Sequence, residues 1–83
     1  MWYLYIAEFN DGKSLYTGIT LDVERRLQQH NSGSGAKSLR GKGPVVLKYT
    51  EQLDSISNAA RREKEVKGWS RKKKLELIHS GLS

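Results

Sequence analysis

Aromatic and aliphatic residues gather in two short runs within the first twenty positions, with polar residues between the runs, which is the pattern of two β-strands joined by a turn. Residues 2–9 are dense in aromatic and aliphatic side chains, and residues 14–20 continue the pattern. The dipeptide Asp11-Gly12 lies between the two runs and favours a two-residue turn, because glycine readily adopts the positive φ that such turns need. The sequence therefore predicts a β-hairpin at the start of the chain.

The two-residue turn also predicts which residues of the hairpin lie opposite each other. Counting back from it places Ala7 opposite Tyr16 and Tyr5 opposite Gly18. Side chains alternate between the two faces of a strand. One face is expected to carry Tyr3, Tyr5, Ala7, Tyr16 and Gly18, and the other Leu4, Ile6, Leu15, Thr17 and Ile19.

A helical period replaces the alternation after the hairpin and predicts a helix over about residues 21–31. Thr20 is a suitable N-cap, and Asp22 and Glu24 fall in the first turn, where the helix dipole favours acidic side chains. The i, i+3, i+4, i+7 positions that pack inward are Val23, Arg26, Leu27 and His30. This helix therefore places a cation and an imidazole along its inward stripe.

The second half of the chain predicts one strand and two helices. Residues 44–53 form a third strand, since a proline at a strand's first position removes no ladder bond. A helix over about residues 57–67 follows, and Gly68 is a natural stop. Ser70 can cap a third helix that ends at Gly81.

The predicted order is thus β-β-α-β-α-α, in a chain of 83 residues. We expect a single α+β domain over residues 1–83, with helices flanking a three-stranded, mostly antiparallel sheet. A chain of this size buries only about 60% of its unfolded surface, so its core must be small.

Composition excludes several classes of function. The chain has no cysteine, which excludes a disulfide framework, a thiolate metal site and cysteine catalysis. No apolar run approaches the roughly 20 residues of a membrane span. The first nine residues lack the basic start of a signal peptide, so a cytoplasmic protein is expected.

The net charge of +6 indicates a polyanionic partner, and nucleic acid is the leading candidate. Eight of the fifteen Lys and Arg residues lie between Arg61 and Lys74, and a Gly/Ser-rich loop after residue 31 carries others. The candidates for phosphate contact are Lys37, Arg40, Lys42, Arg61, Arg62, Lys72, Lys73 and Lys74. The alternative is that these side chains form an ordinary solvated helix face.

A carboxylate also falls in the packing stripe of the second helix, where Glu63 lies among Ala59, Ala60, Val66 and Lys67. Burying a carboxylate is costly unless it is paired or binds a metal. The structural alternative is an ion pair of Glu63 with Arg26 or Lys67. For Arg26 the alternative is a stem that covers the core, and for His30 an ordinary position near a helix C-terminus.

Taken together, these residue types suit phosphodiester cleavage. A phenol or imidazole can orient or deprotonate water, and an arginine offers a fork of donors to phosphate oxygens. One carboxylate is a sparse but workable anchor for Mg²⁺, which keeps several waters and also binds phosphate. These residue types therefore indicate phosphoryl chemistry on a basic surface, but they do not identify a particular enzyme.

The strings WYLYI, LYTGIT and DVERRLQQHN resemble the GIY-YIG nuclease superfamily in their order and spacing. The run from His30 to Lys37, which fits HN-x-G-x-GAK, resembles the small stand-alone bacterial members most closely. The resemblance extends from Trp2 to about Trp69. It implies a three-stranded antiparallel sheet and hydrolysis of nucleic acid with one divalent cation, Mg²⁺ or Mn²⁺.

The resemblance also implies roles for residues that match the motifs. It gives catalytic roles to Tyr5, Tyr16, Arg26, His30 and Glu63, metal binding to Glu63, and a structural role at the site to Gly18. Three features depart from the family pattern. Tyr3 stands where the first motif has its glycine, and Ser38-Leu39 stand where relatives often carry an aromatic residue and a threonine. No asparagine follows Glu63, so that role is unfilled or supplied by Asn31.

The leading hypothesis is therefore a metal-dependent endonuclease module that nicks DNA or cleaves particular DNA structures, as in repair or recombination. The alternative is a nucleic-acid-binding or partner-binding module with weak or no catalysis. The binding module would take nucleic acid as its partner, and the partner-binding module would take another protein. Neither hypothesis involves a membrane.

Overall fold

The computed structural model describes residues 1–32 and 44–81. Its elements are β1 (Trp2–Phe9), β2 (Ser14–Thr20), α1 (Val23–Ser32), β3 (Val46–Leu53), α2 (Ile56–Lys67) and α3 (Arg71–Gly81). The three strands form one sheet in the order β2-β1-β3, and both pairings are antiparallel. The predicted α+β class and the order β-β-α-β-α-α are confirmed.

The hairpin register is the one that the turn predicts, with Tyr5 opposite Gly18 and Ala7 opposite Tyr16. The φ angles of Asp11 and Gly12 are 56° and 81°, the positive values that a two-residue type I′ turn requires. The preceding Asn10 also has a positive φ, of 58°, which the pattern alone does not indicate. Asparagine tolerates this conformation better than most residues do.

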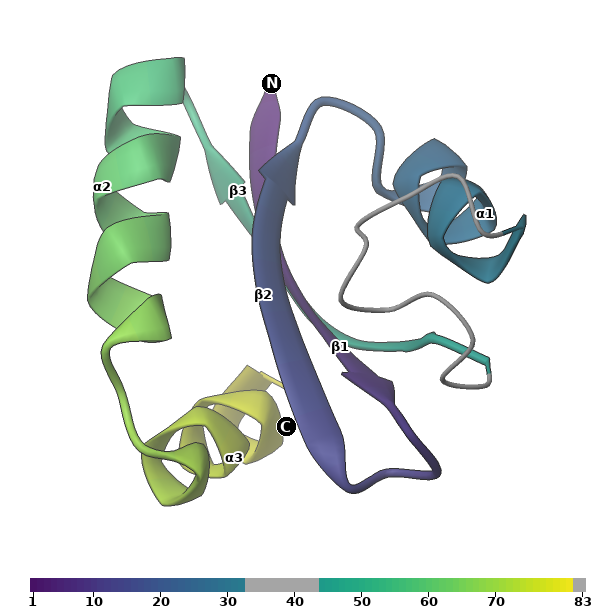
Figure 1. The fold of residues 1–83 in the computed structure, drawn as a ribbon. Coiled ribbons are helices and arrows are strands. Elements are labelled where there is room, and N and C mark those ends of the chain that lie inside the picture. The colour runs from purple at the N-terminus through teal and green to yellow at the C-terminus, as the bar shows by residue number, and fades with distance from the viewer. Residues whose placement is uncertain (33–43, 82–83) are drawn as a thin grey trace.

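The helices cover opposite faces of the sheet, with α1 on one side and α2 and α3 on the other (Figure 1). On the side of the sheet toward α2 and α3, Leu4 and Ile6 of β1 form a buried cluster with Val66 of α2 and Ile78 of α3. The face toward α1 carries Tyr5, Ala7 and Val45, with Val23 and Leu27 packed against them. The predicted division of the hairpin side chains between two faces is therefore confirmed.

The start of α1 lies two residues later than the sequence suggests, because Asp22 rather than Thr20 is its N-cap. The Asp22 carboxylate accepts from the backbone N–H of Arg25 at 3.1 Å, and its carbonyl accepts the first helical bond. The Thr20 hydroxyl instead accepts from the N–H of Asp22 at 3.2 Å, which forms a turn ahead of the helix. Thr20 and Asp22 are both good N-caps. Because the Thr20 hydroxyl takes part in the turn, Asp22 is the residue that caps the helix.

The caps of the other two helices agree with the sequence. The Ser55 hydroxyl accepts from the N–H of Asn58, and the Ser70 hydroxyl from the N–H of Lys73. Gly68 ends α2 as expected, but its φ of −79° lies in the right-handed region. Its N–H donates to the carbonyl of Glu65, so a tightened last turn ends the helix rather than a left-handed residue.

Strand β3 contains a bulge opposite β1, where the register shifts between Ile6 and Ala7. Tyr49 pairs with Ile6 and Leu47 with Ala7, so Lys48 is the extra residue. A bulge bends a strand and re-aims its side chains. None of the helices in residues 1–32 and 44–81 is long and apolar enough to cross a membrane.

Candidate active site

Gly18 on β2 allows the tyrosine of β1 to extend across the edge of the sheet. A Cβ at this position would lie 2.8 Å from the Tyr5 hydroxyl oxygen and 3.1 Å from a ring carbon of Tyr16. The first distance is one that real Cβ atoms essentially never show, and the second is tighter than most Cβ contacts. The two tyrosine rings therefore occupy the space that any larger residue at position 18 would need, which is the structural role expected for this glycine.

Tyr5, Tyr16 and His30 form an aromatic cluster over Gly18. The Tyr5 hydroxyl and His30 Nε2 lie 2.8 Å apart in a buried hydrogen bond. The Tyr16 ring meets the imidazole edge-on at a centroid distance of 5.3 Å, and the two tyrosine centroids are 6.1 Å apart. Residues of β1, β2 and α1 are thus brought into contact, as the sequence predicts.

Burial sets the protonation states of this cluster. It raises the pKa of Tyr5 to about 12, while a hydrogen bond from Arg26 lowers it and the charge of Tyr16 raises it. Burial also lowers the pKa of His30 below its usual value of 6.5, and the positive charge of Arg26 adds to this. At neutral pH the phenol is therefore protonated and the imidazole is neutral.

These states limit the roles of the two rings in their hydrogen bond. The phenol can donate its proton to Nε2 of His30 when the neutral imidazole carries its own proton on Nδ1. The other tautomer reverses the direction, so that Nε2 donates to the phenol oxygen. The positive charge of Arg26 acts on both rings.

Arg26 is half-buried, and a residue that the sequence analysis missed helps to hold it. Its Nη1 donates to Gln29 Oε1 at 3.1 Å. The i, i+3 spacing on a helix is the signal that could have found this pair. A hollow of about 370 Å³ lies beside both side chains, between α1 and the ends of β1 and β2, and its other lining residues are Trp2, Ile19, Thr20, Leu21, Asp22 and Arg25.

Glu63 approaches the same strand edge from the opposite face of the sheet. Its side chain is 24% exposed, and its carboxylate lies 3.5 Å from Lys67 Nζ. Its negative charge contributes to the raised pKa of Tyr5. The predicted stripe needs one correction: Ala59 and Val66 are buried, but Ala60 and Lys67 are exposed, so Glu63 lies at the margin of the packed seam.

The site therefore straddles the β2 edge, between α1 on one face and α2 on the other (Figure 1). Residues 1–32 and 44–81 contain no group of three or more His, Cys, Asp or Glu side chains that could enclose a metal. A single half-buried carboxylate still fits Mg²⁺, because this ion keeps most of its waters and takes further oxygens from a phosphate. Glu63 is the residue that fits this role.

Comparison with known proteins identifies the family. The GIY-YIG catalytic domain matches residues 1–76. The chain belongs to the GIY-YIG family. It is 51% identical to a UPF0213 protein of Haloquadratum walsbyi, over 95% of this chain and 88% of that protein. It is 50% identical to the UPF0213 protein YhbQ of Escherichia coli O8, over 96% of this chain and 79% of that one.

A solved structure agrees with these relatives. The solution NMR structure of a UPF0213 protein of Bacillus halodurans has a TM-score of 0.60 and 50% identity, and covers 95% of this chain and 84% of that one. Small proteins of this kind thus occur in bacteria and archaea. Membership of the GIY-YIG family supports a nuclease-type function, which the printed names of these relatives do not specify further.

Asn31 of this GIY-YIG domain is engaged away from the cluster. Its side-chain oxygen accepts from the Val45 N–H at 2.6 Å, and its nitrogen donates to the Val45 carbonyl at 3.2 Å. These two bonds tie the end of α1 to the residue before β3. The amide is therefore a structural link rather than a stand-in for the asparagine that many GIY-YIG enzymes carry.

Two arginines of the basic helices, the candidate Arg62 of α2 and Arg71 of α3, make internal contacts. Arg62 forms a two-pronged ion pair with Glu51, at 2.8 and 3.2 Å, and a further one with Glu65. Arg71 donates to the carbonyls of Gly12 and Lys13, both at 2.9 Å, and so binds the hairpin turn. Both guanidinium groups therefore already donate to acceptors within the domain.

The other helix candidates for phosphate contact differ in exposure. Arg61 and Lys72 are exposed, and Lys74 is half-buried. The ammonium group of Lys73 lies 4.4 Å from the centre of the Trp69 ring. The loop candidates Lys37, Arg40 and Lys42 lie outside the residues that the structure describes.

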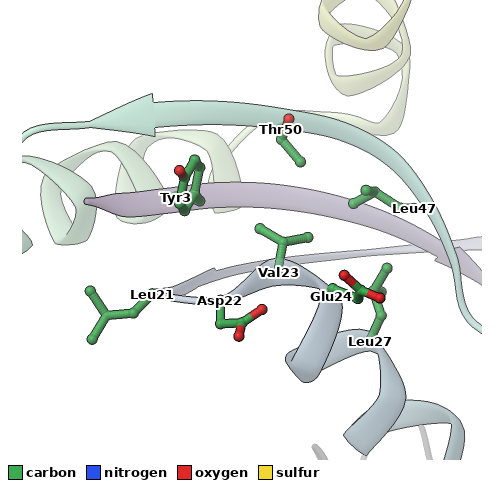
Figure 2. A pocket seen from close by; sticks show the side chains of 8 residues that line it. All are labelled: Tyr3, Leu21, Asp22, Val23, Glu24, Leu27, Leu47 and Thr50. Carbon is green, nitrogen blue, oxygen red and sulfur yellow. The ribbon is translucent and has the colours of Figure 1, made fainter.

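A second hollow, of about 530 Å³, lies at the start of α1 (Figure 2). Its lining residues are Tyr3, Leu21, Asp22, Val23, Glu24, Leu27, Leu47 and Thr50. None of the candidate catalytic residues lines it. Its walls are mostly apolar and carry two carboxylates, which do not suit a phosphate backbone.

The close packing over Gly18 gives a direct test. Gly18→Ala should displace Tyr5 and Tyr16 and lower the free energy of unfolding by about 1–3 kcal/mol, as measured by urea denaturation. Gly68→Ala is the matched control, because its Cβ would meet nothing nearer than 3.5 Å and its φ suits alanine. Equal stability of the two variants would contradict the proposed crowding.

The lowered pKa of His30 predicts a pH dependence of stability. Below pH 6.5 the unfolded chain binds a proton that the folded cluster resists, so the free energy of unfolding should decrease as the pH falls through this region. His30→Gln should lose this component, whereas His79→Gln, at an exposed position on α3, should keep it. Urea titrations at a series of pH values would measure the difference, and parallel curves for all three proteins would refute it.

Proposed function

We propose that this protein is a metal-dependent endonuclease that hydrolyses phosphodiester bonds of DNA, by nicking or by cleaving particular DNA structures, in repair or recombination. Residues 1–83 would act as one GIY-YIG domain in the cytoplasm. The observation that carries the proposal is the Tyr5–His30 hydrogen bond of 2.8 Å at an edge where Arg26 and Glu63 also act on Tyr5. Proton transfer, phosphate binding and a cation anchor thereby come together.

Arg26 would bind the scissile phosphate. Its guanidinium is half-buried beside a hollow, and Gln29 holds one of its nitrogens. An arginine held in this way needs little reorganisation to receive phosphate oxygens, and it can stabilise the charge that develops on them during hydrolysis.

The two tyrosines and His30 would act on the attacking water. Tyr5 or Tyr16 orients the water, and a proton can move from it to the Tyr5 oxygen while the phenol proton moves to Nε2 of His30. This route suits the protonation states at neutral pH, because the high pKa of Tyr5 keeps it a phenol and the low pKa of His30 keeps it ready to accept. His30 ends the step as an imidazolium.

Glu63 would hold one Mg²⁺ or Mn²⁺ at the β2 edge. When bound, the cation would neutralise charge on the phosphate and on the leaving oxygen. The Lys67 ion pair of 3.5 Å is an exposed i, i+4 contact, which is weak enough to give way to a divalent ion. DNA would lie over Arg61, Lys72, Lys73 and Lys74, and over the loop residues Lys37, Arg40 and Lys42.

Replacing the proposed cation anchor tests the function. Glu63→Ala should abolish Mg²⁺- or Mn²⁺-dependent nicking of supercoiled and branched DNA, and should largely spare DNA affinity. Glu76→Ala, which removes an exposed carboxylate of α3, should leave nicking unchanged. Nicking that survives in Glu63→Ala or in excess chelator would refute the role of Glu63. DNA binding without cleavage by the unaltered protein would favour the alternative of a non-catalytic binding module.

The basic surface predicts a salt-dependent effect on binding. Replacing Lys72, Lys73 and Lys74 with alanine should weaken binding to all DNA sequences alike. Each phosphate that the variant no longer neutralises should reduce the slope of log K against log salt by about 0.9. Lys48→Ala removes a lysine that already lies 3.9 Å from Glu8 and should change the slope little. Salt titrations of DNA binding would measure this, and an unchanged slope in the triple variant would move the binding surface to the loop.

A further inference from the structure

Arg62 stands at the centre of a polar network that joins α2 to the far strand of the sheet. Its two bonds to Glu51 reach β3, and Glu51 in turn accepts from the Tyr49 hydroxyl at 2.8 Å. The side chains of the pair are only 25% and 23% exposed. Partial burial, two-pronged geometry and a third group that fixes the carboxylate distinguish this pair from a mobile surface ion pair.

Helix geometry places Arg62 and Glu63 on opposite sides of the seam by which α2 packs on the sheet. Ala59 and Val66 form that buried seam. At about 100° per residue, Arg62 lies about 60° to one side of Ala59 and Glu63 about 40° to the other. Because the strand order is β2-β1-β3, the side of the seam that reaches β3 faces away from β2. Glu63 is thus on the β2 side, where its charge acts on Tyr5.

Of the two buried residues of α2, Ala59 presents only a methyl group to the sheet, which leaves Val66 as the larger side chain that resists rotation of the helix from within the seam. The Arg62–Glu51 pair lies to one side of the seam and joins α2 to β3. Because of this position, it is a polar tie that opposes rotation of the helix about its own axis. A roll that lifted Arg62 from β3 would move Glu63 relative to Tyr5 and Arg26. The Glu63–Lys67 pair cannot prevent this, since both residues lie on the same helix.

We propose that Arg62 and Glu51 are positioning residues that set the roll of α2 and thereby hold Glu63 where its carboxylate can bind the cation at the β2 edge. The inference rests on the proposed function. It concerns two residues that lie on the face of the sheet opposite the aromatic cluster, and it assigns them an effect on cation affinity rather than on the chemical step.

The test compares variants that remove the tie with one that removes a similar contact inside the helix. Glu51→Gln and Arg62→Met break the link to β3. Glu65→Gln removes the other carboxylate partner of Arg62, which belongs to α2 itself and cannot restrain its roll. Mn²⁺ affinity is measured from paramagnetic broadening of the Gly18 and Glu63 amide signals, and nicking of supercoiled DNA is measured over a range of Mn²⁺ concentrations.

We expect Glu51→Gln and Arg62→Met to weaken Mn²⁺ binding about fivefold or more, with a matching rise in the Mn²⁺ concentration for half-maximal nicking. The rate at saturating Mn²⁺ should stay close to that of the unaltered protein. Glu65→Gln should match the unaltered protein in all three quantities. A purely structural role would instead lower the melting temperature and the saturated rate together.

Two results would overturn the proposal: unchanged Mn²⁺ affinity in Glu51→Gln, or an equal loss in Glu65→Gln. Unfolding of both Arg62→Met and the isosteric Glu51→Gln would also overturn it, because the pair would then support the whole fold. Failure of the unaltered protein to bind Mn²⁺ would remove the proposed function first and this inference with it. That result is distinguishable, because it needs no variant.

Discussion

The missing side chain at Gly18 is the constraint on which the site depends. Across the hairpin from Tyr5, it leaves a gap in the edge strand that two phenol rings fill, and a Cβ there would lie within 3 Å of Tyr5. This gap lets a residue of the central strand reach the margin of the sheet, so helices on opposite faces can both act on its phenol. A protein of 83 residues thereby assembles a polar site without opening its core, since Leu4 and Ile6 remain fully buried on the other face.

Local rules were enough for the parts of the fold that depend on neighbours in sequence. The turn at Asp11-Gly12 gave the hairpin register, and with it the facing of Tyr5, because strand periodicity is strict. Thr20 and Asp22 are both suitable N-caps for α1. Asp22 is the one observed, through contacts that sequence spacing does not predict. The side chain of Asn31 bonds the backbone of Val45, which lies 14 residues away. Backbone groups carry no sequence signal, so this link could not be predicted.

The candidate site was also only partly predictable from the sequence. Helical spacing placed Arg26 and His30 inward correctly, but it could not say that burial would leave the imidazole neutral and the phenol protonated. It also overstated the freedom of the basic residues. Arg62 and Arg71 have the same charge as their exposed neighbours, and only the positions of Glu51 and of the hairpin carbonyls show that these two guanidinium groups stabilise the fold. Net charge therefore overestimates the surface available to DNA.

The contact between Arg71 and the hairpin turn has a consequence for the order of folding. It joins groups 58 and 59 residues apart, and so links the first turn of the chain to its last helix. During synthesis the hairpin is made first, yet its tip must wait for α3 to leave the ribosome before the Gly12 and Lys13 carbonyls find this partner. Contacts of such long sequence separation form late and slow the search for the native state. The hairpin tip and α3 therefore complete this contact only after the rest of the domain has brought them together.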